Sequence, residues 1–341
     1  KTGTLIASFG DAGTAIYDID SDSGSGDGGA SVTGVKYEPI KNGITLSGTT
    51  GVSASEKLFS ARILTSDGSL DSTYGASGIN IISGINGKQF AKSATIDAND
   101  TVWVSGVIDD STTKPFVAAI DEQATLFSNF ADVGYLAFDT SFSESGHKEI
   151  AIDLSVPNIA LVEHNSGSLF IAGSKSKTDG EEGFIAKVDQ NGDLDTSFAS
   201  DGIYSTSISG AEKLNLTDLA LHDGNVVAVG SVVIADTPSS FIMMLDSDGT
   251  LDDDFGSNGK IIGTPFEYYE SVFISDDSIF IGGKSVSGAS SELIALKLDS
   301  DGEQTYKYIG ETTIDSENKM VKVLVDESNK LYLIANVVDT P

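Results

Sequence analysis

The apolar residues of this chain occur in short runs, rich in β-branched and aromatic side chains, that end at glycine, aspartate, asparagine or serine. Such runs are typical of β-strands, and no segment keeps a helical spacing of apolar positions for more than two turns. The clearest stretch predicts four consecutive strands, at Leu216–His222, Asn225–Ile234, Ser240–Asp246 and Gly259–Thr264. The pattern therefore predicts an all-β protein.

Two sequence markers repeat along the chain with the same uneven period. The first is a leucine, an aromatic residue four positions later and a glycine four positions after that. It occurs at Leu5/Phe9/Gly13, Leu70/Tyr74/Gly78, Leu126/Phe130/Gly134, Leu194/Phe198/Gly202 and Leu251/Phe255/Gly259, with a decayed copy at Gly302–Tyr308. The second is an apolar run that closes on a small residue, at Gly48, Gly106, Gly173, Gly230, Gly283 and Asn336. Six copies of each marker indicate six structural units.

Four short strands in a unit of about 40–60 residues are typical of a propeller blade. The prediction is a six-bladed β-propeller of four-stranded antiparallel blades, with residues 1–341 as one domain. Turns containing Asp-Gly or Asn-Gly should join the third and fourth strands, at Ser66–Gly68, Gln190–Gly192, Ser247–Gly249 and Ser300–Gly302. The leucine and the aromatic residue that follow each turn are expected to be buried beneath it, as structural anchors.

The order of the markers at the two ends of the sequence predicts how the ring closes. Residues 1–19 carry an anchor and one strand, and residues 319–341 carry two strands, so the closing blade is predicted to be shared between them. One strand of that blade is then missing from residues 1–341. Three alternatives stay open: residues outside this sequence supply the strand, the blade has three strands, or another chain donates a strand.

The composition excludes several functions. Twenty Lys+Arg stand against 51 Asp+Glu, a formal net charge of −31, which disfavours binding to nucleic acid or to anionic lipid. The absence of cysteine excludes disulfides, thiol nucleophiles and cysteine-ligated zinc. No apolar run reaches about 18 residues, so no membrane span is predicted. Arg62 is the single arginine, and the acidic, Ser/Thr/Asp-rich surface favours a secreted or cell-surface protein of a Gram-negative bacterium, with the periplasm as the alternative.

One acidic stretch is a candidate metal site. Asp18, Asp20, Asp22 and Asp27 lie in a glycine-rich segment, and carboxylates at alternate positions can converge on Ca²⁺ when such a loop wraps them. Ser23 stands where an EF-hand-type loop requires glycine, and Gly29 where it requires glutamate. The alternative is a solvated acidic loop between two blades.

The histidines do not form a motif. His147, His164 and His222 show no metal-like spacing, and His164 and His222 are expected to be exposed turn residues. No Gly-x-Ser-x-Gly elbow is present, so no catalytic residues and no organic cofactor are predicted.

The segments at Gly68–Gly75, Gly192–Phe198 and Gly249–Gly256 resemble the bacterial delta-60 repeat, whose pattern is a Gly-x-Leu-Asp-x-x-Phe-Gly turn after a strand that ends in Ala-Gly. Ala199 replaces the last glycine of the second copy, the copy at Ala124–Phe130 lacks the aspartate, and the copy at Gly302–Tyr308 is degraded. The resemblance implies a β-propeller in a secreted or surface protein and implies no chemistry.

Three functions are therefore compatible with the sequence. The first is a non-enzymatic secreted or surface module that binds a protein or glycan partner or serves as a structural unit. The second is a propeller hydrolase or lyase with a metal in the central channel. The third is an assembly subunit that exchanges a strand with its neighbour.

Overall fold

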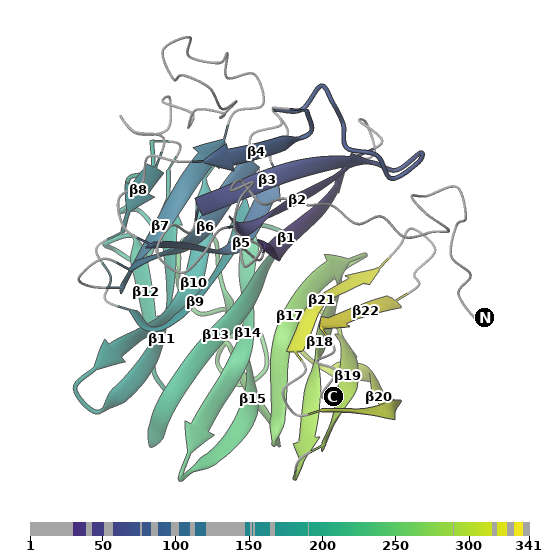
Figure 1. The fold of residues 1–341 in the computed structure, drawn as a ribbon. Helices are drawn as coiled ribbons and strands as arrows, with labels where there is room; N and C mark the ends of the chain where they lie inside the picture. Colours follow the sequence, from purple (N-terminus) through teal and green to yellow (C-terminus); the bar gives the residue numbers. More distant parts are fainter. Residues whose placement is uncertain are drawn as a thin grey trace. The chain divides into compact units, whose positions relative to one another are not determined.

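The computed structural model describes residues 30–38, 43–50, 57–75, 77–82, 88–96, 102–109, 113–120, 147–150, 152, 154–163, 168–189, 191–288, 290–315, 319–325 and 331–336 (Figure 1). All regular structure in these residues is β, as predicted. They contain no helix that is long and apolar enough to cross a membrane. The chain divides into two compact units, Lys1–Asp153 with Gln190–Gly192, and Leu154–Asp189 with Asp193–Pro341.

The first unit contains two four-stranded antiparallel sheets, each a meander in chain order. One consists of β1 (Ala30–Glu38), β2 (Gly43–Thr50), β3 (Lys57–Leu64) and β4 (Ile79–Ile82). The other consists of β5 (Lys88–Ile96), β6 (Val102–Asp109), β7 (Thr113–Ile120) and β8 (His147–Glu149).

The second unit contains three four-stranded sheets and a described pair of strands. The sheets are β9 (Leu154–Glu163), β10 (Leu169–Lys177), β11 (Gly180–Val188) and β12 (Ile203–Thr206); β13 (Ala211–His222), β14 (Asn225–Ile234), β15 (Thr237–Leu245) and β16 (Lys260–Pro265); and β17 (Glu267–Ser275), β18 (Ser278–Ser287), β19 (Ser290–Leu298) and β20 (Gln304–Asp315). The pair is β21 (Lys319–Val325) and β22 (Leu331–Asn336). Strands β13–β16 confirm the four strands predicted between Leu216 and Thr264 to within a few residues.

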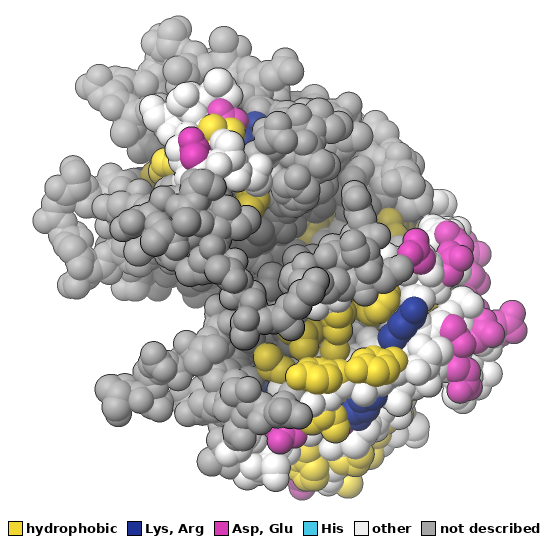
Figure 2. Space-filling model, turned by 90° about the vertical axis from the view of Figure 1, so that its right-hand side faces the viewer, with side chains coloured by type: hydrophobic (Ala, Val, Ile, Leu, Met, Phe, Trp, Pro, Cys, Tyr) yellow, Lys and Arg dark blue, Asp and Glu magenta, His cyan; other side chains and the backbone are white. Residues whose placement is uncertain are grey.

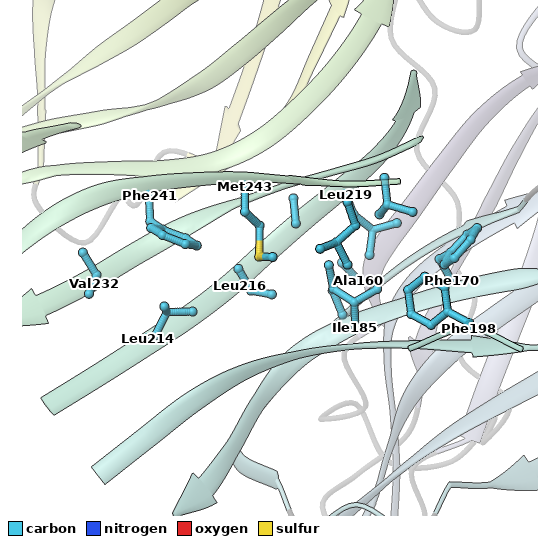
Figure 3. Close-up of a cluster of buried hydrophobic side chains, with 14 residues drawn as sticks. Ala160, Phe170, Ile185, Phe198, Leu214, Leu216, Leu219, Val232, Phe241 and Met243 are labelled. Atoms are coloured by element: carbon cyan, nitrogen blue, oxygen red, sulfur yellow. The ribbon is translucent and has the colours of Figure 1, made fainter. Parts of the chain in front are cut away.

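The sheets of the second unit bury both of their faces, because successive residues of one strand point into different cores. In β14, Val226 and Ala228 pack with residues of sheet β9–β12, such as Phe170. The alternate residues Val227 and Val229 pack with residues of sheet β17–β20. Figure 3 shows the first of these cores, in which Phe170 and Phe198 meet edge to face with ring centroids 5.4 Å apart. Each sheet is thus a layer that cannot be stable alone.

The second sequence marker has a backbone cause. The first strand of a sheet carries a β-bulge beside the marker glycine, between Leu216 and Asp218 in β13 and between Tyr269 and Ser271 in β17. A Cβ at Gly230 would lie 1.9 Å from the carbonyl oxygen of Asn215, and one at Gly283 would lie 2.1 Å from that of Tyr268. Glycine is needed here because the bulge brings the neighbouring backbone too close for any side chain.

The first marker is confirmed as a structural anchor. The aromatic residues Tyr74, Phe198 and Phe255 are at most 1% exposed. The leucines of the described copies, Leu70, Leu194 and Leu251, are only half-buried, so the prediction that they are buried is wrong. Each forms an isolated antiparallel bridge with the end of the third strand, as Leu251 does with Leu245.

Three expectations stay predictions: that the chain forms six blades, that the closing blade is shared between the two ends of the sequence, and that residues 1–341 form one domain. Residues 1–29 lie outside the described part of the chain, and so do the candidate calcium ligands Asp18, Asp20, Asp22 and Asp27.

Candidate functional site

The anchor segments, residues 194–202 and 251–259, join each sheet to the next one in the second unit. The N–H of Ala199 donates to the carbonyl of Asp248 (2.8 Å), and the N–H of Gly256 donates to the carbonyl of Asp301 (2.9 Å). In both cases the acceptor lies in the Asp-Gly turn of the following sheet. The ring of the anchor aromatic packs under this turn of the following sheet, so that a Cβ at Gly249 or Gly302 would lie 2.9 Å from a ring carbon of Phe198 or Phe255. The prediction that each aromatic residue lies beneath the turn that precedes it in its own sheet is therefore wrong. These turn residues are therefore structural.

The copy of the anchor in sheet β17–β20 has opened into a strand. Tyr308 stands 53 residues after Phe255, but Gln304 and Thr305 replace Leu251 and Asp252 of the intact copy. Ile309 and Thr312 then stand 53 residues after Gly256 and Gly259, whose φ angles are 58° and 76°. β-Branched residues strongly disfavour such angles. The chain runs on as β20 instead.

The outcome is an exposed apolar edge. Tyr306, Tyr308 and Ile309 of β20 are 57%, 42% and 49% exposed. Strand β20 is the last strand of its sheet in the order β17-β18-β19-β20, so its outer edge has no described neighbour. Figure 2 shows hydrophobic side chains gathered on this side of the molecule, with acidic side chains along their margin. We call Tyr306, Tyr308 and Ile309 the β20 edge patch.

A second arrangement is a line of polar groups at the bulges of the first strands. One carboxylate oxygen of Asp218 accepts hydrogen bonds from the Ser271 hydroxyl (3.0 Å) and the Val272 N–H (2.9 Å), and it pairs with the ammonium of Lys322 (2.9 Å). The Ser271 hydroxyl accepts a bond from the Val323 N–H (3.1 Å). Asp218 is 7% exposed. The Asp218 carboxylate therefore connects β13 to β17 and β21 through these hydrogen bonds and this ion pair.

A buried tyrosine lies on the same strand as Ser271. Tyr269 is 3% exposed, and its backbone carbonyl accepts a hydrogen bond from the Thr217 hydroxyl (2.7 Å). Burial raises the pKa of Tyr269 to about 12, and the nearby Glu267 carboxylate adds to the rise. The phenol therefore stays neutral and serves as a packing group.

The third arrangement is a cluster of His222, Asp223 and Asp277, in which one ring nitrogen and one oxygen of each carboxylate lie within 4.8 Å of one another. The two aspartates are exposed, whereas His222 is 8% exposed. The prediction that His222 is an exposed turn residue is therefore wrong. It is the last residue of β13, directly before the Asp223–Gly224 turn, and it is buried. The side chains of His147 and His164 lie outside the described residues.

Histidine spacing could not reveal this cluster because it contains one histidine, and Asp277 lies 54 residues after Asp223. The register of the repeats could have revealed it. Asp223-Gly224 and Asp276-Asp277 are the same hairpin turn in two successive units, and neighbouring units bring equivalent turns side by side.

Comparisons with known proteins support the fold. The family described as "Domain of unknown function (DUF5122) beta-propeller" matches residues 222–255, a segment that runs from the His222 turn to the anchor aromatic Phe255. The fold is that of a β-propeller. No curated protein matches the chain.

Solved structures resemble the chain at low identity. Drosophila Semaphorin 2a is 10% identical, with a TM-score of 0.45 over 78% of this chain and 47% of that one, so this chain spans about half of it. Sqt1 from Chaetomium thermophilum is 13% identical, with a TM-score of 0.38 over 87% and 75%. The polysaccharide lyase Uly1 is 12% identical, with a TM-score of 0.38 over 78% and 55%. Identities this low do not extend the function of any of them to this chain.

Proposed function

We propose that this protein is a non-enzymatic β-propeller module, secreted or displayed at the cell surface, that binds a protein partner at the β20 edge patch. The observation that carries the proposal is the opened anchor. At the equivalent position of the two preceding sheets the aromatic residue is at most 1% exposed, whereas Tyr308 is 42% exposed. Exposed apolar side chains grouped along one element are typical of interaction sites.

The edge of β20 also supplies backbone groups to a partner. An outermost strand presents unpaired N–H and C=O groups that can pair with an extended segment of another chain. The inward residue Lys307 holds the strand in place through its ammonium, which lies 2.6 Å from the carboxylate of the buried Glu267. Tyr306 and Tyr308, which lie on the other face of the strand from Lys307, are therefore presented on a rigid element.

The charge of the chain specifies the chemistry of the partner. With a formal net charge of −31, a second acidic copy would be repelled at low ionic strength. Exposed Asp301 and Glu303 lie just before β20. The partner segment is accordingly an extended stretch in which basic residues alternate with apolar ones.

The non-enzymatic assignment is supported by how Asp218, a buried carboxylate on a first strand of the described part of the chain, is used. A channel hydrolase or lyase needs carboxylates on the first strands that are free to bind a metal or move a proton. Asp218 is instead neutralised by Lys322 and held by two hydrogen bonds from β17.

Titration with a synthetic probe tests the proposal. The probe is a dye-labelled peptide of alternating lysine and valine, and its matched control carries N-methyl groups that remove the strand-pairing hydrogen bonds but keep the charge. We expect fluorescence anisotropy to show binding of the first peptide only, slower hydrogen exchange of the β20 amides on binding, and at least tenfold weaker binding to the Y306S/Y308S variant.

Other outcomes overturn it. Equal binding of both peptides would mean nonspecific charge attraction. Binding of neutral oligosaccharides without protection of β20 would indicate a glycan-binding module. Self-association of the free chain that Y306S/Y308S abolishes would indicate an assembly subunit.

A further inference from the structure

The ends of β13 and β17 place two hairpin turns beside each other. The Asp223–Gly224 turn has φ angles of 51° and 88°, and the Asp276–Asp277 turn has φ angles of 45° and 55°. Left-handed angles at both central residues define the tight turn that matches the twist of a hairpin. The positions of Asp223 and Asp277 are therefore fixed by the backbone, and β13 and β17 pack against each other as the first strands of adjacent sheets.

His222 carries an unmet hydrogen-bonding need at this place. The residue is 8% exposed, and in the part of the chain that the structure describes its buried Nε2 has no hydrogen-bond partner. A buried polar atom without a partner is costly, and the rare cases in native proteins call for an explanation. The side chain is directed into the cluster, because one of its ring nitrogens lies within 4.8 Å of both carboxylates.

From this geometry we infer that His222, Asp223 and Asp277 form a binding site for a divalent first-row transition-metal cation such as Zn²⁺. One imidazole nitrogen and two carboxylate oxygens are a ligand set that suits Zn²⁺. Ca²⁺ and Mg²⁺ bind through oxygen ligands and gain little from the imidazole. Three protein ligands leave a position for water, and the exposure of the two aspartates leaves the cation a path from solvent.

The cation would also have a structural effect. It would join the turn of sheet β13–β16 to the turn of sheet β17–β20, at the ends of the same first strands that Asp218 joins at their bulges. The site lies on first strands, whereas the β20 edge patch lies on the last strand of its sheet. The two proposals therefore stand on different residues and fail separately.

Calorimetric titration of the untagged chain with ZnCl₂ tests the site. The sequence has no cysteine and three histidines in all, so few other groups compete for Zn²⁺. We expect one Zn²⁺ per chain and a rise in melting temperature with ZnCl₂ that CaCl₂ and MgCl₂ at the same concentration do not produce. Substitution with Co²⁺ should give a visible ligand-field spectrum.

A matched pair of variants identifies the ligands. Asp277→Asn removes a ligand, and Asp276→Asn changes the neighbouring residue of the same turn, whose side chain is outside the cluster. Asparagine tolerates left-handed φ, so both variants keep the turn. We expect Asp277→Asn to weaken Zn²⁺ binding about 10-fold to 100-fold or more, the range seen when even an outer partner of a ligand is lost, and Asp276→Asn to leave it unchanged.

A further variant separates binding from folding. His222→Gln should abolish tight Zn²⁺ binding, but it also alters a buried position. The double variant D223N/D277N changes only exposed side chains. It should abolish tight Zn²⁺ binding as well, while the melting temperature of the metal-free chain stays unaltered. Unchanged Zn²⁺ binding in D223N/D277N, or equal responses to Zn²⁺ and Ca²⁺ in the parent chain, would overturn the inference.

Discussion

Phe255 and Tyr308 occupy the same position in two successive repeats, and they differ in what lies over them. Phe255 is 1% exposed because the Asp301–Gly302 turn of the next sheet covers its ring, and a Cβ at Gly302 would lie 2.9 Å from it. Tyr308 is 42% exposed on an open strand. An anchor residue thus stabilises the protein only when its own segment turns and a neighbouring turn covers it.

The difference follows from a few residues around the aromatic position. In the intact copy the Asp252 carboxylate accepts a hydrogen bond from the Asp254 N–H (3.1 Å), and the Phe255 N–H donates to the Asp252 carbonyl. The Gly259 N–H then closes onto the carbonyl of Phe255 (2.9 Å). The β20 copy has Thr305 and Thr312 where these contacts involve Asp252 and Gly259, and Ile309 stands at the position of the left-handed Gly256. The absence of the turn, rather than of the aromatic residue, creates the edge.

The largest expected effect on stability follows removal of the covered ring of Phe255. Phe255→Ala should lower the free energy of unfolding by about 3–5 kcal/mol, the usual result of emptying a buried phenylalanine site. Tyr308→Ala, the matched change on the open strand, should alter it by no more than about 0.5 kcal/mol. Urea unfolding of both variants gives the two values. Similar losses would mean that Tyr308 is covered in solution.

Much of this could be predicted from the sequence. The two markers located the strands, the turns and the buried aromatics because each marker reports a local backbone requirement: a left-handed residue, a bulge or a tight turn. The burial of His222 could not be predicted from its neighbours, since the sequence around it predicts a turn while the packing of β13 against β17 decides its exposure. The exposure of Tyr308 could have been predicted from the sequence, because Ile309 and Thr312 stand at positions where the intact anchor has glycine.

The second test concerns the turn that covers an anchor. Gly249→Ala places a Cβ at a φ of 89°, 2.7 Å from the Ala199 nitrogen and 2.9 Å from the Phe198 ring. We expect a loss of about 2–4 kcal/mol, from left-handed strain together with overpacking.

Gly288→Ala is the control for Gly249→Ala. Gly288 also has a positive φ, 64°, but nothing lies within 4 Å of a Cβ there. The Gly288→Ala variant should lose only the part of the unfolding free energy that comes from left-handed strain, roughly 1–2 kcal/mol. Thermal or urea unfolding measures both, and equal losses would show that the turn does not press on the Phe198 ring.

A third change should stabilise the protein. Ala199 follows the anchor Phe198 and holds a φ of 50°, where the intact copies have Gly75 and Gly256 at 52° and 58°. Ala199→Gly relieves the strain of a left-handed alanine and should raise the free energy of unfolding by about 1 kcal/mol. Ala228→Gly in strand β14 should have the opposite sign, because glycine weakens a strand interior. A destabilising Ala199→Gly would contradict the comparison of the copies.

The smallest effect concerns the aspartate that the β20 copy has lost. In the anchor of sheet β9–β12, hydrogen bonds from Ser197 and the ammonium of Lys187, 3.0 Å away, lower the pKa of Asp195 from 3.8. Because the folded-state pKa lies below the unfolded one, the charged carboxylate stabilises the fold above pH 3.8, and this contribution disappears as the pH falls through the folded-state pKa. Asp195→Asn should therefore cost about 0.5–1 kcal/mol at neutral pH, a value limited by solvent screening.

The pH dependence distinguishes this contribution from a general change of charge. The difference in unfolding free energy between the parent chain and Asp195→Asn should shrink toward zero as the pH falls below 3.8. Asp179→Asn removes the same charge from an exposed position, and by reducing the repulsion within a chain of net charge −31 it should be neutral or slightly stabilising at neutral pH. If the two variants follow the same curve, the aspartate of the anchor acts only through the overall charge. Its loss from the β20 copy would then contribute nothing to the opening of that strand.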